Sequence, residues 1–172
     1  FGYRMNKQLY QFFTDDHRRL EALLTLATQN IQNVDMEAYN TFRTGLLTHI
    51  KMEEKILFPA AQKANAGVPL PIFARLRLEH GAITSLMVPP PTASLIKALW
   101  HILEKHDLAE EEPGGMYEVC EALTTNETAS LLTALANISA VPVHPVNTAP
   151  YALDASKRAL ARAGYDYDAI AS

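Results

Sequence analysis

The stretch HIKMEEKILFP, residues 49–59, decides how this chain is interpreted. It continues a helical pattern of apolar residues three and four positions apart, yet His49 and Glu53 lie on the same inward stripe. A soluble helical core normally places leucine there, because an unpartnered buried polar group costs on the order of 1–3 kcal/mol and an unpaired carboxylate costs more. The stretch therefore predicts that something inside the protein partners this imidazole and this carboxylate.

Three other segments show the same helical periodicity, and each also carries a histidine on its apolar stripe. The segments cover residues 5–29, 71–88 and 92–112, and their inward histidines are His17, His80 and His106. The segment around His49 begins after Asp35, a suitable N-cap residue. Short connections rich in helix breakers separate the four segments, so neighbouring helices are expected to run antiparallel. The chain is therefore predicted to be all-α, with an up-down four-helix bundle.

Further short helices are expected after the four long segments. Helical patterns cover residues 116–123 and 127–138, beyond the helix breaker PGG, and no strand pattern is evident. The prolines of VPVHPVNTAPY then predict an extended chain, followed by a short helix in LDASKRALARAG with Asp154 as its N-cap. We expect a bundle with a following helix over residues 1–140, and a C-terminal tail over 141–172 whose short helix packs on the bundle.

Composition limits the classes of protein and partner. A chain of 172 residues with 48% hydrophobic and 20% charged residues is ordinary for one globular domain. Its net charge of -4 gives no basic surface, which argues against nucleic acid as a partner. No apolar run approaches the ~20 residues that a membrane span needs. The single cysteine, Cys120, permits no intrachain disulfide, and a reducing cytoplasm is the simplest expected location.

Four histidines and two glutamates are candidate metal ligands. His49 is followed four residues later by Glu53, and such pairs lie on one helix face roughly 5–6 Å apart. His106 and Glu110 repeat this spacing. Six unpartnered buried polar groups would cost about as much as the whole stability of a domain, ~5–15 kcal/mol, and a bound cation removes that conflict. The predicted metal ligands are His17, His49, Glu53, His80, His106 and Glu110.

The other histidines are not expected to bind metal. His101 lies five residues before His106, well round the helix from it, and is interpreted as a surface residue. His144 lies in the proline-rich tail. In the acidic run at 110–112, the two residues after Glu110 are expected to be solvated.

The two segments that carry the glutamates also resemble each other. Both read H-x-x-x-E-E, in HIKMEE from His49 and in HDLAEE from His106. An aromatic residue follows in each, Phe58 in the first and, two positions later, Tyr117 in the second. This echo predicts a pseudo-symmetric site in which the two helices have equivalent roles.

The ligand types restrict the metal. Imidazole with carboxylate suits iron, zinc, copper or nickel, but a structural zinc takes four ligands and often thiolates. Six convergent ligands fit two irons bridged by carboxylates better. Ferritin-type di-iron bundles use Glu-x-x-His, whereas this chain has His-x-x-x-Glu, which argues against that class.

The ordered set DDHRRL around His17, HIKMEEKILFP, LEHGAI and HDLAEE resembles the hemerythrin family, specifically its HHE cation-binding branch, over roughly residues 5–125. The resemblance implies an up-down four-helix bundle around a non-haem di-iron centre, with an oxo or hydroxo bridge. It also implies that Glu53 and Glu110 bridge two iron ions and that the four histidines are terminal ligands.

One departure from the oxygen-carrying hemerythrins concerns the third helix, where those proteins have two histidines four residues apart. Here Leu76 and Thr84 stand four residues either side of His80, and the neighbouring Glu79, or another nearby carboxylate, is the candidate replacement ligand. Without a fifth histidine, about eight of the twelve positions on two octahedral irons are filled by these side chains. The reduced protein is therefore expected to oxidise in air rather than carry oxygen reversibly.

The expected function is that of a cytoplasmic hemerythrin-like protein that binds or senses iron, O2 or NO. Its expected partners are metal ions and a small diatomic ligand, with a homodimer left open. One alternative is a di-iron redox enzyme that reduces peroxide or NO. Another is a helical interaction module with a structural metal. The sequence has no separate nucleophile, phosphate loop or cofactor fingerprint that favours an enzyme.

Overall fold

The computed structural model describes residues 7–172, and the regular elements within that range are all helical, so the all-α prediction is confirmed. The helices are α1 (Gln8–Ala27), α2 (Met36–Met52), α3 (Phe58–Ala64), α4 (Ile72–Leu86), α5 (Ala93–Glu111), α6 (Met116–Leu123), α7 (Thr128–Ala136), α8 (Pro150–Arg162) and α9 (Tyr167–Ala171). A π-helical turn, Glu53–Leu57, joins α2 to α3, and a 3-10 turn, Thr125–Glu127, precedes α7. The expected helix start near Met5 lies outside the described residues.

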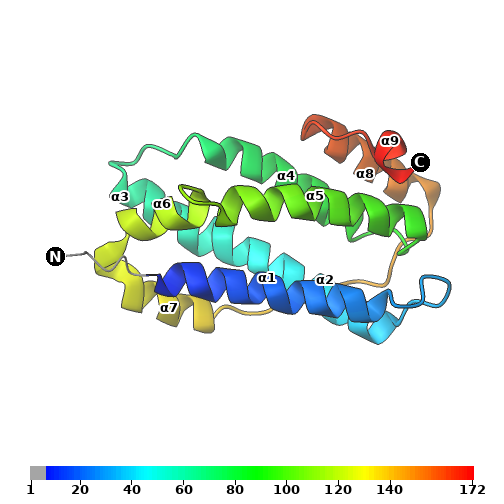
Figure 1. Ribbon diagram of the computed structural model, residues 1–172, viewed down its shortest axis with the longest axis horizontal. Helices are drawn as coiled ribbons and strands as arrows, with labels where there is room; N and C mark the ends of the chain where they lie inside the picture. The colour runs from blue at the N-terminus through cyan, green and yellow to red at the C-terminus, as the bar shows by residue number, and fades with distance from the viewer. Residues whose placement is uncertain (1–6) are drawn as a thin grey trace.

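The histidine-bearing helices α1, α2, α4 and α5 lie side by side along the long axis of the molecule (Figure 1). Helix α1 packs on α2, and α4 packs on α5. The predicted N-cap of α2 is confirmed, because the Asp35 side chain accepts a hydrogen bond from the backbone N–H of Ala38. Thr92 caps α5 in the same way. Each such cap stabilises a helix start by about 1 kcal/mol.

The C-terminal segment returns along the outside of these helices. Helix α8 packs on α4, and α9 packs on α5. The predicted N-cap of α8 is wrong: the helix begins at Pro150, and Asp154 lies within its first turns. Proline is well suited to the first helical position, because its fixed φ matches the helix and its missing N–H would have no intrahelical partner there. Between residues 7 and 172, no helix is both long and apolar enough to cross a membrane.

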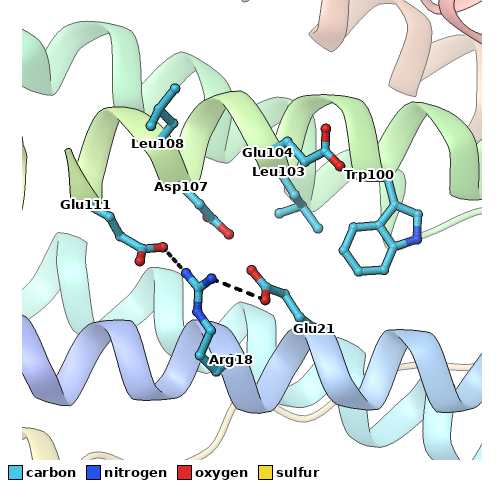
Figure 2. Close-up of a pocket in the computed structure, with 8 residues that line it drawn as sticks. All are labelled: Arg18, Glu21, Trp100, Leu103, Glu104, Asp107, Leu108 and Glu111. Atoms are coloured by element: carbon cyan, nitrogen blue, oxygen red, sulfur yellow. Dashed lines mark hydrogen bonds and ion pairs between the residues drawn. The ribbon is translucent and has the colours of Figure 1, made fainter.

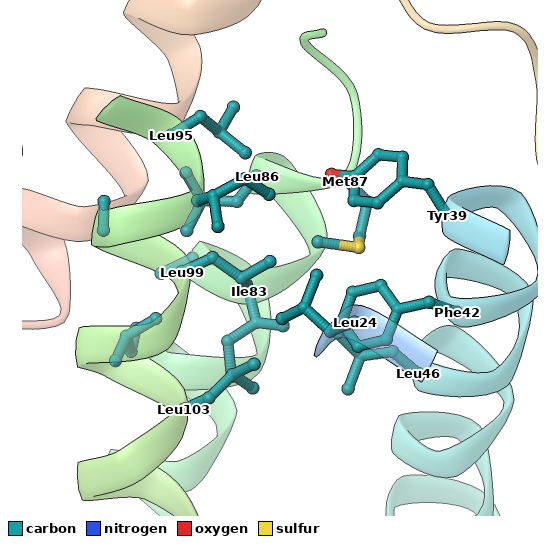
Figure 3. Close-up of a cluster of buried hydrophobic side chains, with 14 of the residues drawn as sticks. Leu24, Tyr39, Phe42, Leu46, Ile83, Leu86, Met87, Leu95, Leu99 and Leu103 are labelled. Atoms are coloured by element: carbon teal, nitrogen blue, oxygen red, sulfur yellow. The ribbon is translucent and has the colours of Figure 1, made fainter. Parts of the chain in front are cut away.

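Two apolar cores occupy the two ends of the helix assembly. We call the first the tail-side core, because α8 and α9 help to cover it (Figure 3). Its largest buried side chains include Leu24, Tyr39, Phe42, Ile83, Leu86 and Leu99. The second, the α6-side core, includes Leu9, Phe13, Phe58, Phe73, Leu76 and Met116. Full burial of one such side chain stabilises the fold by roughly 1.5–3 kcal/mol, so a helix assembly with two cores tolerates a polar layer between them.

That polar layer follows from the order of residues along each helix. In α1 the stripe passes from Phe13 in the α6-side core to His17 and then to Leu20 in the tail-side core. In α4 it passes from Leu76 through His80 to Ile83. The histidines of all four helices are therefore at the same level, between the cores.

A surface pocket of about 280 Å³ opens between α1 and α5 at the level of the polar layer (Figure 2). Its lining residues are Arg18, Glu21, Trp100, Leu103, Glu104, Asp107, Leu108 and Glu111. Arg18 makes ion pairs with Glu21 and Glu111, so it links the two helices across the pocket. The acidic residues outnumber this single arginine, which favours a cation over an anion at the mouth of the pocket.

Candidate metal centre

The polar layer contains two clusters of potential metal ligands, and each cluster brings four ligand atoms within 4.8 Å of one another. The first cluster is His17, His49, Glu53 and Glu110. The second is Glu53, His80, His106 and Glu110. All six residues singled out in the sequence thus lie together, all are buried, and the two glutamates belong to both clusters. His101 is half-buried beside Tyr165 and His144 is exposed, and neither belongs to a cluster among the described residues.

The π-helical turn positions one of the shared carboxylates. It begins at Glu53, and the backbone N–H of Phe58 bonds to the Glu53 carbonyl five residues earlier. The side chains of Glu53 and Phe58, at the two ends of this wider turn, are both fully buried. Glu53 reaches the polar layer, and Phe58 packs in the α6-side core. Single π turns within α-helices are often found at functional sites. The run EEKILF keeps helical hydrogen bonds and still presents a ligand and a core residue.

Each shared glutamate turns one oxygen toward each cluster. For Glu53, Oε2 lies 3.3 Å from Nε2 of His49 in the first cluster, and Oε1 lies 2.9 Å from Nε2 of His80 in the second. For Glu110, Oε1 lies 3.2 Å from Nε2 of His17, and Oε2 lies 3.4 Å from Nε2 of His106. A carboxylate with its two oxygens in separate clusters has the placement that bridging two cations requires.

The outward ring nitrogens contact a second set of carboxylates. Nδ1 of His49 lies 2.7 Å from Asp16, and Nδ1 of His80 lies 3.1 Å from Glu54. Nδ1 of His106 lies 3.0 Å from Glu79, and Nδ1 of His17 lies 2.8 Å from Glu111. An outer carboxylate that accepts the Nδ1 proton leaves Nε2 free to bind a metal and makes the ring a better ligand.

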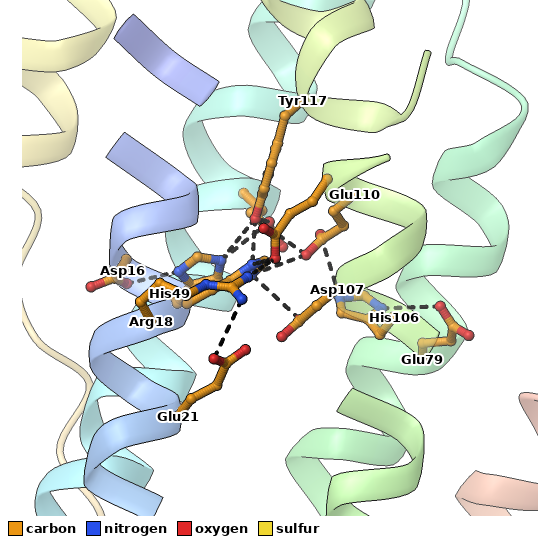
Figure 4. A network of polar contacts seen from close by, with 12 residues as sticks. Asp16, Arg18, Glu21, His49, Glu79, His106, Asp107, Glu110 and Tyr117 are labelled. Atoms are coloured by element: carbon orange, nitrogen blue, oxygen red, sulfur yellow. Dashed lines mark hydrogen bonds and ion pairs between the residues drawn. The ribbon is translucent and has the colours of Figure 1, made fainter. Parts of the chain in front are cut away.

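These outer contacts form a closed circuit around the helices. Each outer carboxylate is the sequence neighbour of a candidate ligand on its own helix, but it contacts the histidine of the next helix. Asp16 of α1 contacts α2, Glu54 of the π turn contacts α4, Glu79 of α4 contacts α5, and Glu111 of α5 contacts α1. Every helix therefore orients the ligand of its neighbour, as seen in part in Figure 4.

Two expectations about acidic residues need correction. Glu111 was expected to be solvated, but it is half-buried and contacts both His17 and Arg18. Glu79, the candidate replacement ligand, contacts the outer nitrogen of His106, and its other oxygen accepts a hydrogen bond of 2.7 Å from Tyr165. Glu79 is thus an outer partner of a histidine. An acidic residue next to one candidate ligand in each of the four segments was the signal in the sequence for this outer set.

The histidines and carboxylates of the polar layer shift one another's pKa values. Burial alone would lower the pKa of each histidine, but the facing carboxylates reverse this effect. The pKa of His49 is raised to about 9, and those of His17 and His106 are raised well above the ordinary value. Burial also acts to raise the pKa of Glu53, yet His49 and His80 hold it well below its usual range. Protons on the imidazoles thus supply the positive charge that a bound cation would otherwise supply.

The donor set fits a metal, and one buried atom supports this fit directly. Glu110 Oε2 is buried without a hydrogen-bond partner, since His106 at 3.4 Å lies within ion-pair distance but does not make a hydrogen bond. A buried carboxylate oxygen without a donor is costly. Because this oxygen belongs to the second cluster, a cation held by that cluster would satisfy it.

A third group of potential ligands connects the first cluster to the surface pocket. It comprises His17, Asp107 and Glu111, and both acidic residues also line the pocket. Asp107 lies 3.4 Å from Nε2 of His17, and burial raises the pKa of Asp107 to about 6. Sequence patterning did not single out Asp107, although it directly follows His106.

Tyr117 of α6 is the other residue that sequence patterning did not place in the site. Its hydroxyl group points into the first cluster and lies within 3.2 Å of four of its atoms (Figure 4). The echo between the two His-x-x-x-Glu-Glu segments had marked this aromatic residue without indicating its role. The breaker PGG between Glu110 and Tyr117 lets the chain fold back onto the site.

Comparison with known proteins is consistent with this geometry. A family model described as the hemerythrin HHE cation binding domain matches residues 8–113, which is more than half of the chain and includes all six residues of the two clusters. No curated protein and no solved structure shows significant similarity. With this match and the paired clusters, the chain belongs to the family of hemerythrin HHE cation-binding domains.

Proposed function

We propose that this protein binds two iron ions in a non-haem di-iron centre and uses them to bind or sense O2, NO or iron itself. The observation that carries the proposal is the pair of buried four-ligand clusters that share Glu53 and Glu110. In this proposal the two glutamates bridge the ions. His17 and His49 hold one ion, and His80 and His106 hold the other.

The scaffold in this proposal is the up-down four-helix bundle formed by α1, α2, α4 and α5. Residues 1–140 form the metal-binding domain, and residues 141–172 form a tail on its outside. The packing of α8 on α4 and of α9 on α5 supports this division. A reducing cytoplasm suits both ferrous iron and the free, buried Cys120.

Iron is preferred because of the number and kind of ligands. A structural zinc site is closed by four ligands and often includes thiolates, whereas here two clusters share carboxylates and no cysteine takes part among the described residues. Imidazole and carboxylate donors suit several first-row metals, but paired bridging carboxylates favour two adjacent ions. When bound, the two irons would supply a redox-active centre able to take a small exogenous ligand.

The chain's own residues prepare the site for that ligand. The outer carboxylates hold Nδ1 of each histidine, so that Nε2 faces the centre in a fixed orientation. The two apolar cores on either side exclude water from the polar layer. The pocket between α1 and α5 is lined in part by Asp107, which lies beside His17, so a small molecule in the pocket would be near the first cluster.

Metal analysis combined with an optical spectrum tests the proposal. Protein purified without oxygen and loaded with ferrous iron is expected to hold two irons per chain after dialysis. On mixing with air it is expected to oxidise without the reversible spectrum of an oxygen carrier, because the third helix lacks the second histidine. A stoichiometry of one, or a spectral change that reverses when oxygen is removed, would contradict this expectation.

A di-iron redox enzyme that reduces peroxide or NO is the second candidate. The pocket favours it, because an acidic surface pocket beside one cluster suits repeated entry and exit of a small substrate. The iron-loaded protein would then turn over peroxide or NO many times with an electron donor. A single turnover per centre would favour binding or sensing.

A further inference from the structure

The hydroxyl group of Tyr117 occupies a position that the family match does not describe. Tyr117 lies on α6, beyond the end of the matched region at residue 113. The side chain is buried, with 1% of its surface exposed. Its oxygen lies 2.6 Å from Glu53, 3.0 Å from His17, 3.1 Å from His49 and 3.2 Å from Glu110. These four residues are the complete first cluster.

Hydrogen bonding explains these contacts only while the two histidines are protonated. Nε2 of His17 and Nε2 of His49 can then donate to the hydroxyl oxygen, which donates its one proton to Glu53. A metal held by both Nε2 atoms would displace their protons and leave the hydroxyl oxygen beside the ion. Two ligand atoms that are each about 2.1 Å from one metal and at right angles lie about 3 Å apart. The separations of 3.0 and 3.1 Å from the Tyr117 oxygen to the two histidines match that spacing.

The ring of Tyr117 is held so that its oxygen cannot turn away easily. It stacks on Phe13, with ring centroids 5.0 Å apart and planes inclined by 20°. Tyr10 meets it edge-on at 6.4 Å. All of these rings are contributed by α1 and α6, so the packing of these two helices fixes the hydroxyl.

Two contacts fix α6 itself. The carboxylate of Glu121 accepts hydrogen bonds from the backbone N–H groups of Leu9 and Tyr10, which are free donors in the first turn of α1. The chain reverses at Gly115, where an added Cβ would lie 2.7 Å from the carbonyl oxygen of Glu112. Only glycine therefore allows this close return, which brings Tyr117 back to Glu110.

We infer that the hydroxyl oxygen of Tyr117 is a further ligand of the metal held by His17 and His49. This assignment rests on the proposed di-metal function and adds an anionic oxygen to one of its two positions. A phenol that coordinates a ferric ion releases its proton to solvent, as a coordinating thiol does. Within residues 7–172, the Tyr117 hydroxyl contacts the second cluster only through the two shared glutamates, so the added ligand belongs to the first cluster.

The test uses the full chain loaded with iron and oxidised. A phenolate bound to ferric iron gives a charge-transfer absorption in the visible region, and resonance Raman scattering excited in that band shows tyrosine ring vibrations. We expect the unmodified protein to show both signals. Tyr117→Phe should lose both while it retains two irons per chain by metal analysis.

Tyr39→Phe is the matched control, because it also removes one buried tyrosine hydroxyl. The Tyr39 hydroxyl lies in the tail-side core without a hydrogen-bond partner, so this variant should keep the absorption and the Raman bands. If Tyr117→Phe does not fold, growth with ring-deuterated tyrosine decides the matter, since the Raman bands of the unmodified protein should shift.

Three results would overturn the inference. Two irons per chain without tyrosine vibrations would leave Tyr117 as a hydrogen-bonding residue only. Tighter iron binding by Tyr117→Phe would show that the hydroxyl obstructs the site. Failure of the unmodified protein to bind iron would overturn the proposed function, and the inference with it. Metal analysis separates that last case from the other two.

Discussion

The two halves of the candidate metal centre, the His17–His49 half and the His80–His106 half, are built alike but differ in their surroundings. Both use one oxygen of each shared glutamate, and in both every histidine has an outer carboxylate. The first half also contains the Tyr117 hydroxyl and adjoins the surface pocket through Asp107. In the second half, His80 stacks on Phe58, which in turn stacks on Phe73.

If both halves bind metal, we expect this difference to separate two tasks that a pseudo-symmetric ligand set alone would not distinguish. Phenylalanine rings pack on both halves, so it is the distance from the pocket that suits the second half to an ion that stays in place. The half beside the pocket suits exchange with small molecules from solvent. An acidic pocket also attracts cations, so metal loading would begin on the same side.

The largest expected effect comes from removing what the two halves share. Glu53→Ala and Glu110→Ala should each lose both metals, because each carboxylate contributes an oxygen to both clusters. Metal content per chain after dialysis measures this. Glu104→Ala, which removes an exposed acid at the pocket, should retain both. One metal retained by Glu110→Ala would contradict the bridging role.

Substitution of a histidine in one half should affect the metal of that half and leave the metal of the other half in place. His49→Ala should lose the metal of the first half and, with it, the visible absorption assigned to Tyr117. His80→Ala should lose one metal but keep that absorption. Metal content and the visible spectrum of both variants check this. Loss of the absorption in both variants would mean that the halves are not independent.

The outer carboxylates should have a smaller effect, since they act through the histidines. Asp16→Asn and Glu54→Gln should each weaken metal binding by about 10–100-fold. Asp16 is the more buried of the two carboxylates, so we expect the larger loss in the first half. Competition with a chelator measures the affinities. Asp15→Asn, one residue away on the exposed side of α1, is the control and should bind metal normally.

The last prediction concerns the pH dependence of stability, which acts indirectly on the two halves and distinguishes the metal-free from the loaded protein. The folded-state pKa of His49 is about 9, above its unfolded value of about 6.5. A raised pKa stabilises the fold fully below the unfolded value, so this stabilisation is lost as the pH rises from about 6.5 to about 9. The melting temperature of the metal-free protein should therefore fall over that range.

The loaded protein should behave oppositely, because its histidines bind metal in their neutral form. Its melting temperature should hold in mild alkali and fall in acid, where protons compete with the metal. Differential scanning calorimetry of both forms at matched pH values tests this. The difference between their melting temperatures at each pH removes the contribution of groups that titrate in both forms. Parallel curves for the two forms would contradict the expectation.

The sequence alone was sufficient to place the four long helices and to name six candidate ligands, whereas α9 and the π-helical turn at Glu53 were not predicted. Helical periodicity depends only on residues near in sequence. The positions of the histidines on the apolar stripes of α1, α2, α4 and α5 could therefore be predicted without knowing how the helices pack. The spacing of four residues likewise places His49 with Glu53, and His106 with Glu110, on one face. Caps such as Asp35 are local too, and the same argument failed at Asp154 because Pro150 offered an earlier start.

Only the tertiary structure decided which groups from different helices meet. The outer circuit depends on the relative rotation of packed helices, so the acidic neighbours of the ligands could not be matched to histidines beforehand. The packing of α4 on α5 places Glu79 beside the outer nitrogen of His106, so it is a partner of that histidine instead of a candidate ligand. The position of Tyr117 depends on a reversal at Gly115 and on Glu121 binding the start of α1, more than a hundred residues away in sequence. Contacts of that range are set by the packing of the whole chain, whereas the ligand spacing is set by a single helical turn.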